Sequence, residues 1–311
     1  MGNNVMDNSE IKPFDIVGRG KSAVVFYRGG GIVTKKFFNS PDKEKIALDK
    51  EKVKKEFERH KFALDAGLPV PRLHSPIYTV SPLIMGEESL CYDMEFVDGL
   101  NLKKKMKGAN LREREKSISK MVEIQKNIYR VAVCDKGKFD RIDDELKRYI
   151  NASKYLKKCW KKPLIDLLDN LSGNSLSFCH CDFAAPNIIC DVNDRYYIID
   201  WANAKLGNPL YCMCVTYMHF YLHMHPYCDQ VEHPGEEAGM SDSMNIYLQK
   251  IKEMMGINRE DLFAWLPLYG AIYLSKIPAE NPKAHHNKGE KLIAILNKWA
   301  EKEGLETIYT A

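Results

Sequence analysis

The 311-residue chain lacks the features that carry a protein into or across a membrane. It contains no apolar run of about 18 residues, so a membrane-spanning helix is not indicated. Its opening stretch, MGNNVMDNSEIKPFD, has no apolar core of the kind found in secretory signals. Gly2 follows the first methionine, but Met6 stands where N-myristoylation needs serine or threonine. We therefore expect a cytoplasmic protein whose residues 1–13 form a flexible leader.

A strong charge of one sign is absent as well. The 46 Lys and Arg residues nearly balance the 42 Asp and Glu residues, and the formal net charge is only +4. The basic runs LKKKMK and YLKKCWKK are typical of solvated helix faces. We expect no nucleic-acid partner, and no segment indicates an obligate protein partner.

The nine cysteines lack the spacing of a structural zinc site, which leaves at least two residues between neighbouring ligands. Single residues separate Cys179 from Cys181 and Cys212 from Cys214. An odd number of cysteines and the absence of a secretory signal indicate reduced thiols.

A change of pattern near residue 98 predicts two regions. Residues 16–38 have strand character, with AVVFYR and IVTKKFF forming a hairpin around Gly29–Gly31. A charged helix is expected from about residue 41 to 66, because Gly67 and the following prolines forbid its continuation. SLCYDMEFV is a further strand that Asp98 and Gly99 close.

Helices dominate after this point. SISKMVEIQKNIYRVAV and ELKRYINASKYLKKCW have amphipathic helical spacing. The strand signals SLSFCHC and RYYIIDWA lie on either side of the candidate turn DVND. Four more helices are expected after Pro209, in YCMCVTYMHFYLH, MNIYLQKIKEMMG, EDLFAWLPLYGAIYLSKI and KGEKLIAILNKWAEKEG. The pattern predicts an α+β fold with a small β-rich lobe and a larger, mainly helical lobe.

The stretch FDIVGRGKSAVVF contains Gly-Lys-Ser, the end of a phosphate-binding P-loop. A P-loop has another glycine five positions before the glycine of Gly-Lys-Ser, but Asp15 stands there. A P-loop also leads into a helix, whereas a strand follows here. We therefore predict a glycine-rich hairpin in which Gly18 and Gly20 let the backbone approach a phosphate. Ser22 is either a phosphate contact or only a hairpin residue.

The segment FCHCDFAAPNIICDVNDRYYIIDW carries the clearest chemistry. Phosphoryl transfer needs charge neutralisation, a metal ion and alignment more than covalent help from the protein. Asp182 is suited to accept the proton of an attacking hydroxyl, and Asn187 with Asp200 offers the hard oxygen ligands that Mg²⁺ prefers. We expect His180 to brace this loop by hydrogen bonds.

HCDFAAPN followed by IIDW resembles the catalytic and metal-binding segments of the aminoglycoside phosphotransferase and choline kinase-like family, which is related to protein kinases. The usual family pattern is His-Gly-Asp-x-x-x-x-Asn, then Ile-Asp-Trp or Ile-Asp-Phe. The resemblance covers roughly residues 14–280 and implies a two-lobed protein kinase-like fold that uses ATP and Mg²⁺, with GTP not excluded. It also implies a nucleotide-binding lobe over residues 14–98 and a catalytic, substrate-binding lobe over residues 99–311.

The same resemblance assigns roles outside the catalytic segment. Lys35 in VTKKF aligns with the strand lysine that pairs with ATP phosphates, and Lys36 is the competing choice. Glu56 is the best candidate for the partner of this lysine, with Glu58 second. YDMEFVDG resembles the hinge strand, whose backbone would hold the adenine edge. The predicted nucleotide-binding residues are Gly18, Gly20, Ser22, Lys35, Met94, Glu95 and Val97.

Two residues depart from the family pattern. Cys181 replaces the glycine between the histidine and the aspartate, and Cys212 stands where the family usually has an aspartate that supports the catalytic loop. The two departures are the sequence support for an alternative function, a nucleotide-binding pseudokinase or regulatory protein.

Substrate recognition is predicted from the region after Asp200. The acidic stretch CDQVEHPGEEAGMSD suits a cationic substrate such as an aminoglycoside or a choline-like amine, although an ordinary solvated loop has the same composition. The candidate substrate residues are Asp229, Glu232, Glu236 and Glu237. His219 and His223 have a spacing that can bind metal on a helix, but cleft-lining histidines are favoured.

The sequence therefore predicts a kinase that moves the γ-phosphate of ATP to a hydroxyl of an aminoglycoside-, choline- or sugar-like molecule. A protein- or RNA-associated kinase is less favoured, because a helix follows within about a dozen residues of Asp200 and leaves little platform for a peptide.

Overall fold

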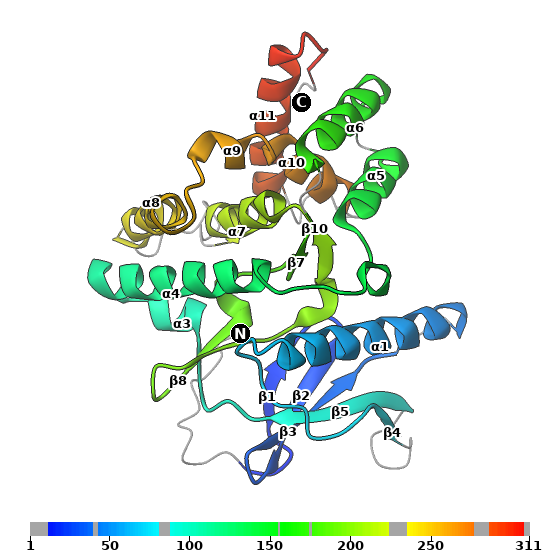
Figure 1. Ribbon diagram of the computed structural model, residues 1–311, viewed down its shortest axis with the longest axis vertical. Coiled ribbons are helices and arrows are strands. Elements are labelled where there is room, and N and C mark those ends of the chain that lie inside the picture. The colour runs from blue at the N-terminus through cyan, green and yellow to red at the C-terminus, as the bar shows by residue number, and fades with distance from the viewer. Residues whose placement is uncertain are drawn as a thin grey trace. The chain divides into compact units, whose positions relative to one another are not determined.

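The computed structural model describes residues 12–39, 43–80, 88–154, 156–173, 176–223, 235–276 and 286–307 (Figure 1). The chain divides into two compact units. The first comprises Met1–Lys107 and Ala185–Ala204, and the second comprises Gly108–Ala184 and Lys205–Ala311. The segment that contains Asn187 and Asp200 thus belongs with the N-terminal strands, whereas Asp182 belongs to the second unit.

The first unit is built on a five-stranded antiparallel sheet with the order β1-β2-β3-β5-β4. Its strands are β1 (Ile16–Arg19), β2 (Ala23–Gly29), β3 (Ile32–Phe37), β4 (Tyr78–Val80) and β5 (Ser89–Glu95). Helix α1 (Lys43–Asp65) accompanies this sheet (Figure 1). Val53 of α1 joins Val33, Tyr92 and Met94 of the sheet in one apolar core. Removal of these side chains from water holds the helix against the sheet.

The predicted hairpin between AVVFYR and IVTKKFF is confirmed, because β2 and β3 pair in antiparallel register from Ala23↔Phe37 to Gly29↔Ile32. Gly29, Gly30 and Gly31 all have positive φ angles, of 91°, 61° and 74°. Only glycine adopts this conformation at little cost, which explains the three consecutive glycines at the turn.

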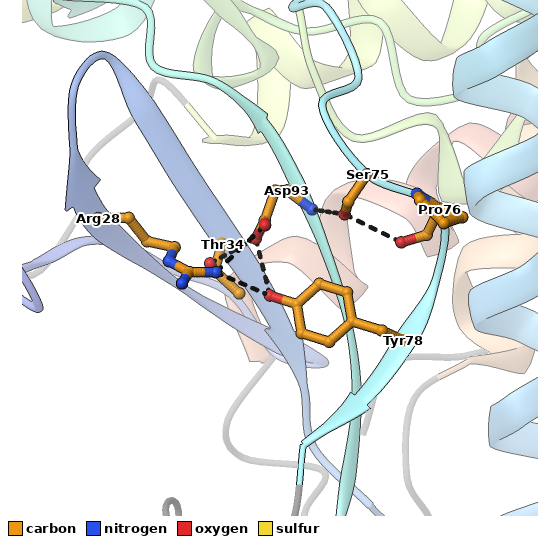
Figure 2. Close-up of polar contacts among 6 residues, drawn as sticks. All are labelled: Arg28, Thr34, Ser75, Pro76, Tyr78 and Asp93. Atoms are coloured by element: carbon orange, nitrogen blue, oxygen red, sulfur yellow. Dashed lines mark hydrogen bonds and ion pairs between the residues drawn. The ribbon is translucent and has the colours of Figure 1, made fainter.

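A polar network on the sheet ties four of its strands together (Figure 2). Asp93 of β5 accepts hydrogen bonds from Thr34 Oγ1 at 2.6 Å and Tyr78 Oη at 2.8 Å. Arg28 of β2 lies 3.2 Å from the other oxygen of the same carboxylate. The side chains of β2, β3 and β4 thus converge on one residue of β5, whose main-chain N–H also donates to Ser75 Oγ at 2.8 Å. This convergence fixes the strand that leads to the predicted hinge.

A second sheet in the first unit has the order β6-β8-β9. Its strands are β6 (Gly99–Asn101), β8 (Ile188–Asp191) and β9 (Tyr196–Ile198), accompanied by the short helices α3 (Leu102–Met106), η3 (Ala185–Asn187) and η4 (Trp201–Asn203). The DVND turn joins β8 to β9, with Asp194 at a φ of 59°. The SLSFCHC strand, β7 (Ser177–Cys179), is not part of this hairpin and pairs instead with β10 (Lys205–Gly207) in the second unit.

The second unit is mainly helical. Its helices are α4 (Leu111–Tyr129), η2 (Lys136–Lys138), α5 (Ile142–Ala152), α6 (Lys158–Ser172), α7 (Pro209–His223), α8 (Gly235–Met255), α9 (Arg259–Phe263), α10 (Leu266–Ser275) and α11 (His286–Lys302). Helix α4 packs on α8, and α10 packs on α11 and α5. In the part of the chain that the structure describes, no helix has the length and apolar character needed to cross a membrane.

Two helices expected to be continuous are broken. The helix predicted over residues 145–160 is wrong, because α5 ends at Ala152 and α6 begins at Lys158. Ser153 has extended backbone angles, and its Oγ accepts a hydrogen bond from the Leu156 N–H at 3.3 Å. A serine side chain that bonds nearby backbone in this way competes with helix formation.

The helix predicted over residues 260–277 is also divided, into α9 and α10. Pro267 lies in the first turn of α10, where its missing N–H costs nothing, but it cannot continue a preceding helix.

Candidate active site

Lys35 and Glu56 form an ion pair in the first unit. Lys35 Nζ donates to Glu56 Oε1, and the two side chains are 12% and 5% exposed. Tyr92 donates a second hydrogen bond to the same oxygen at 3.2 Å. Glu56 is therefore held from strands β3 and β5 while its own backbone belongs to α1. Glu58 is exposed, and Lys36 follows Lys35 on the strand, where side chains alternate between the two faces.

Asp200 lies beside this pair. Its Oδ1 is 3.6 Å from Lys35 Nζ, so the lysine contacts two carboxylates. Burial by itself lowers the pKa of Lys35, but the negative charges of Glu56 and Asp200 outweigh it and hold the pKa above its ordinary value. Lys35 is therefore a firmly charged ammonium group at neutral pH.

The β8–β9 hairpin brings Asn187 and Asp200 to one end. Ile188 pairs with Ile198, so Asn187 comes just before the first pair and Asp200 two residues after it. The Ile199 N–H donates to the Asn187 carbonyl at 3.0 Å, which extends the pairing by one step. Asp200 has the left-handed angles φ 65° and ψ 68°, a conformation that aspartate tolerates better than most residues. Its carboxylate is partly exposed, at 44%.

The segment carrying Asp200 is anchored to the rest of the first unit. Arg59 of α1 donates to the Ala202 carbonyl, and the Ile198 N–H donates to the Pro69 carbonyl at 2.8 Å. Trp201, next to Asp200, is completely buried. These contacts explain how Asp200 reaches Lys35 from a distant part of the sequence.

The glycine-rich stretch forms the β1–β2 hairpin, as the sequence predicts, and no helix follows it. Neither Gly18 nor Gly20 has a positive φ. A Cβ atom on Gly18 would lie 3.5 Å from Val25, and one on Gly20 would lie 3.7 Å from the Ala23 carbonyl. The fold itself therefore does not require glycine at either position. Lys21 and Ser22 are exposed.

The predicted hinge lies at the end of β5. Met94 is 9% exposed and belongs to the apolar core. The Glu95 N–H donates to the Arg72 carbonyl at 2.8 Å, and the Phe96 N–H donates to the Gly31 carbonyl at 2.7 Å. These two N–H groups are therefore already engaged within the protein. The predicted adenine contacts at this backbone would have to come from its carbonyl oxygens or from residues after Phe96, such as Val97.

In the second unit, Asp182 lies on the loop after β7. Its N–H donates to His180 Nδ1 at 3.3 Å, and His180 is buried against Phe183. The predicted bracing role of His180 is compatible with this contact. Cys181 has a φ of 60°, the left-handed conformation for which glycine, its usual counterpart in the family pattern, has no steric cost.

Cys181 and Cys212, the two departures from the family pattern, touch each other. Their Sγ atoms are 3.6 Å apart. Burial raises the pKa of both thiols well above the ordinary value, so both are protonated at neutral pH. The pair fills the position between the loop and α7 with soft, uncharged groups.

Two residues that the sequence did not single out as loop contacts also reach this loop. His219 Nε2 lies 2.9 Å from Asp182 Oδ1, and Thr216 Oγ1 donates to the Phe183 carbonyl at 2.7 Å. Their spacing of three residues on a helix puts them on one face, but only the fold shows what that face contacts. Among the described residues, no group of three or more histidine, cysteine or acidic side chains is arranged to hold a metal ion.

The candidate substrate residues Asp229 and Glu232, and also His225, lie outside the described residues. Glu236 and Glu237 fall in the first turns of α8, whose backbone is described while these side chains are not. The structure thus leaves the acidic stretch as a sequence prediction.

Residues 18–221, about two thirds of the chain, match the family model described as the phosphotransferase enzyme family. The chain belongs to this family. The matched range contains both Gly18 and Gly20 of the glycine-rich hairpin, Lys35, Glu56, the Asp182 loop and the β8–β9 hairpin. No curated protein sequence matches this chain significantly.

Solved structures of phosphotransferases and kinases have the same fold. A thermostable mutant of aminoglycoside phosphotransferase APH(4)-Ia, in a ternary complex with AMP-PNP and hygromycin B, has a TM-score of 0.60 at 17% identity, covering 92% of this chain and 94% of that one. Choline kinase LicA from Streptococcus pneumoniae has a TM-score of 0.55 at 14% identity, covering 93% and 96%. A choline/ethanolamine kinase family protein from Mesorhizobium loti has a TM-score of 0.55 at 13% identity, covering 94% and 86%. At these identities the likeness concerns the fold alone, which is the kinase-like α+β fold that the sequence predicts.

Proposed function

We propose that this member of the phosphotransferase enzyme family is an ATP-dependent kinase that phosphorylates a hydroxyl group of a small molecule. The observation that carries the proposal is the contact of Lys35 with both Glu56 and Asp200. A lysine fixed by one carboxylate and adjacent to a second, partly exposed carboxylate is suited to hold nucleotide phosphates near a metal ion.

Lys35 holds the α- and β-phosphates through its ammonium group in this reaction. Glu56 keeps the lysine in position and charged, and Tyr92 keeps Glu56 in place. Gly18 and Gly20 carry no side chain, so the backbone of the hairpin can come close to the phosphates, although the Gly20 N–H itself donates to the Ala23 carbonyl at 2.8 Å. This role agrees with the finding that the fold itself does not require glycine at either position.

Asn187 and Asp200 fit a magnesium ion chemically. They offer one amide oxygen and one carboxylate oxygen from the same end of a hairpin, and Mg²⁺ commonly takes its other ligands from phosphates and water. When bound, the ion supplies positive charge to the phosphate oxygens. Asp200 has a partly exposed carboxylate for this purpose, and its position is fixed by the burial of Trp201.

Asp182 accepts the proton of the acceptor hydroxyl as that oxygen attacks the γ-phosphate. Its side chain is 29% exposed, so it remains open to a substrate. Its pKa does not have to be raised for this role, because a loose transition state makes little demand on the base. The acceptor classes that we propose are aminoglycoside-, choline- and sugar-like molecules.

The test measures ADP formation and phosphorylated product with Mg·ATP and a panel of hygromycin B, streptomycin, choline, ethanolamine and simple sugars. Asp182→Asn keeps the shape of the side chain but cannot take a proton. We expect it to bind Mg·ATP with wild-type affinity by isothermal titration and to lose at least about 100-fold in turnover. Wild-type turnover in this variant would remove Asp182 from the proposed role.

Binding of Mg·ATP without phosphorylation of any acceptor would favour the pseudokinase alternative. A failure of Mg·ATP to bind the wild-type protein would overturn both functions, because each of them requires a nucleotide site.

A further inference from the structure

Three side chains on one face of α7 contact three consecutive residues of the Asp182 loop. Cys212 touches Cys181 at 3.6 Å, Thr216 donates to the Phe183 carbonyl at 2.7 Å, and His219 lies 2.9 Å from Asp182. The intervals of four and three residues are those of one helix face. Helix α7 thus contacts each of these three loop residues, and His219 is the contact that reaches a carboxylate oxygen.

The contact between Thr216 and Phe183 is held in place by a chain of buried hydrogen bonds. Gln125 of α4 donates to Thr216 Oγ1 at 3.0 Å, and Tyr247 of α8 donates to Gln125 Oε1 at 2.8 Å. All three side chains are completely buried. A fully connected buried hydrogen-bond chain holds its members in a single arrangement, so α7 is fixed relative to the backbone of the loop.

We propose that His219 is a positioning residue for Asp182. The inference rests on the proposed role of Asp182 as proton acceptor. With its proton on Nε2, His219 donates to Oδ1 and thereby fixes the rotation of the carboxylate about its Cβ–Cγ bond. The two carboxylate oxygens then have distinct roles. Oδ1 accepts the hydrogen bond from His219, and Oδ2 is the oxygen that accepts the proton of the substrate hydroxyl.

The contacts of Thr216 and His219 take the place of the loop contact made by an aspartate that the family pattern has and this chain lacks. The family pattern has an aspartate at the position of Cys212, where a neutral thiol cannot accept hydrogen bonds strongly from the loop. Here the loop backbone is held by Thr216 and the catalytic carboxylate by His219, one and two turns further along α7. Both His219 and Asp182 are partly exposed, at 24% and 29%, so the contact leaves the carboxylate within reach of a substrate.

The kinetic test compares His219→Ala, His219→Gln and Tyr217→Phe, using Mg·ATP and whichever panel acceptor is phosphorylated. His219→Ala should lower kcat by about 10- to 100-fold while the KM for ATP changes less than about twofold, because only the reacting carboxylate is misplaced. His219→Gln should recover most of the loss, since its amide nitrogen can take the place of Nε2. Tyr217→Phe is the matched control on α7, because it keeps the ring contact with Phe263 and should retain wild-type kinetics.

A kcat for His219→Ala within twofold of wild type would overturn the proposal. Equal losses in the alanine and glutamine variants would overturn it too, because a hydrogen-bond donor would then not be what matters. Loss of activity in His219→Ala together with a large fall in Tm would indicate only a structural role.

A second measurement does not need activity and separates this inference from the proposed function. Asp182→Ala, His219→Ala and the double variant form a thermal-denaturation cycle. If the two side chains interact, the Tm shift of the double variant differs from the sum of the single shifts by at least about 1 °C. Additive shifts would overturn the contact, whether or not any acceptor has been phosphorylated.

Discussion

The ammonium group of Lys35 lies 3.6 Å from the carboxylate of Asp200, although one belongs to the third strand of the chain and the other follows the ninth. Glu56 contacts the same ammonium group from α1. Charges from three separate parts of the sequence therefore converge within one compact unit. Lys35 and Glu56 are mostly buried, whereas Asp200 is partly exposed. Burying charged groups is costly, so a cluster of this kind that remains open to solvent is a candidate functional site.

Replacement of Lys35 should be far more damaging than replacement of the other lysines near it. Lys35→Ala should lower kcat by about 100-fold or more, because it removes the charge that we propose as the contact to the phosphates. Lys36→Ala and Lys21→Ala should stay within a few-fold of wild type in the same phosphotransfer assay. A larger loss for Lys21→Ala than for Lys35→Ala would instead support a P-loop.

Asp200 should determine the magnesium requirement. In Asp200→Asn one hard anionic oxygen is replaced by a neutral one, so the Mg²⁺ concentration for half-maximal turnover should rise at least about tenfold. Titration of Mg²⁺ at fixed ATP measures this shift, and excess EDTA should abolish turnover in the wild type. Asp194→Asn, at the opposite end of the β8–β9 hairpin, is the control and should retain the wild-type requirement. Equal requirements in Asp200→Asn and wild type would exclude Asp200 as a ligand.

Gly20→Ala should separate nucleotide binding from folding. A methyl group at this position meets nothing closer than 3.7 Å, and its backbone is not left-handed, so Tm should be unchanged or slightly higher through the lower entropy of the unfolded chain. The KM for ATP should rise several-fold if the proposed phosphate lies against this backbone, because the added carbon would stand between the two. Gly99→Ala is the contrasting variant: its Cβ would lie 2.2 Å from the Cys190 carbonyl, so Tm should fall strongly. An unchanged KM in Gly20→Ala would count against the phosphate-binding hairpin.

His60 should make stability depend on pH. Burial is the main cause that lowers the pKa of His60 to about 4, and its ring Nε2 lies 2.7 Å from the Pro71 carbonyl. The unfolded chain, with an ordinary pKa near 6.5, binds a proton that the folded protein excludes. Stability contributed by the neutral ring is thus present above pH 6.5 and lost as pH falls toward 4, by roughly 3 kcal/mol at most.

The measurement for His60 is urea unfolding at several pH values between 4 and 7 for the wild type and for His60→Gln. Glutamine can donate to the same carbonyl but does not titrate, so the slope between pH 6.5 and 4 should be smaller in the variant. Carboxylates contribute equally to both proteins and cancel in the difference. Parallel pH profiles would show that His60 is not the responsible group.

The sequence was sufficient to predict those features of the fold that depend only on neighbouring residues. The three glycines at the β2–β3 turn, the end of α1 before Gly67 and the order of Asp182, Asn187 and Asp200 all follow from short stretches, because turn geometry and strand alternation act over a few residues. The predicted start of α4 was too late: the helix begins at Leu111, six residues before the predicted segment, and the capping box of Asn110 and Glu113 is a local signal that could have placed it. The break after Ala152 depended on a single serine side chain that turns back on the backbone.

By itself, the sequence determined the fold class and the family resemblance, and it supplied the candidate residues for phosphotransfer, because these depend on residue type, order and spacing. Only the tertiary structure decided that Asp200 contacts Lys35, that Cys181 meets Cys212, and that His219 reaches Asp182. These contacts join positions far apart in the chain, and no local propensity specifies them. They arise because buried anchors such as Trp201 and Thr216 bring the segments together.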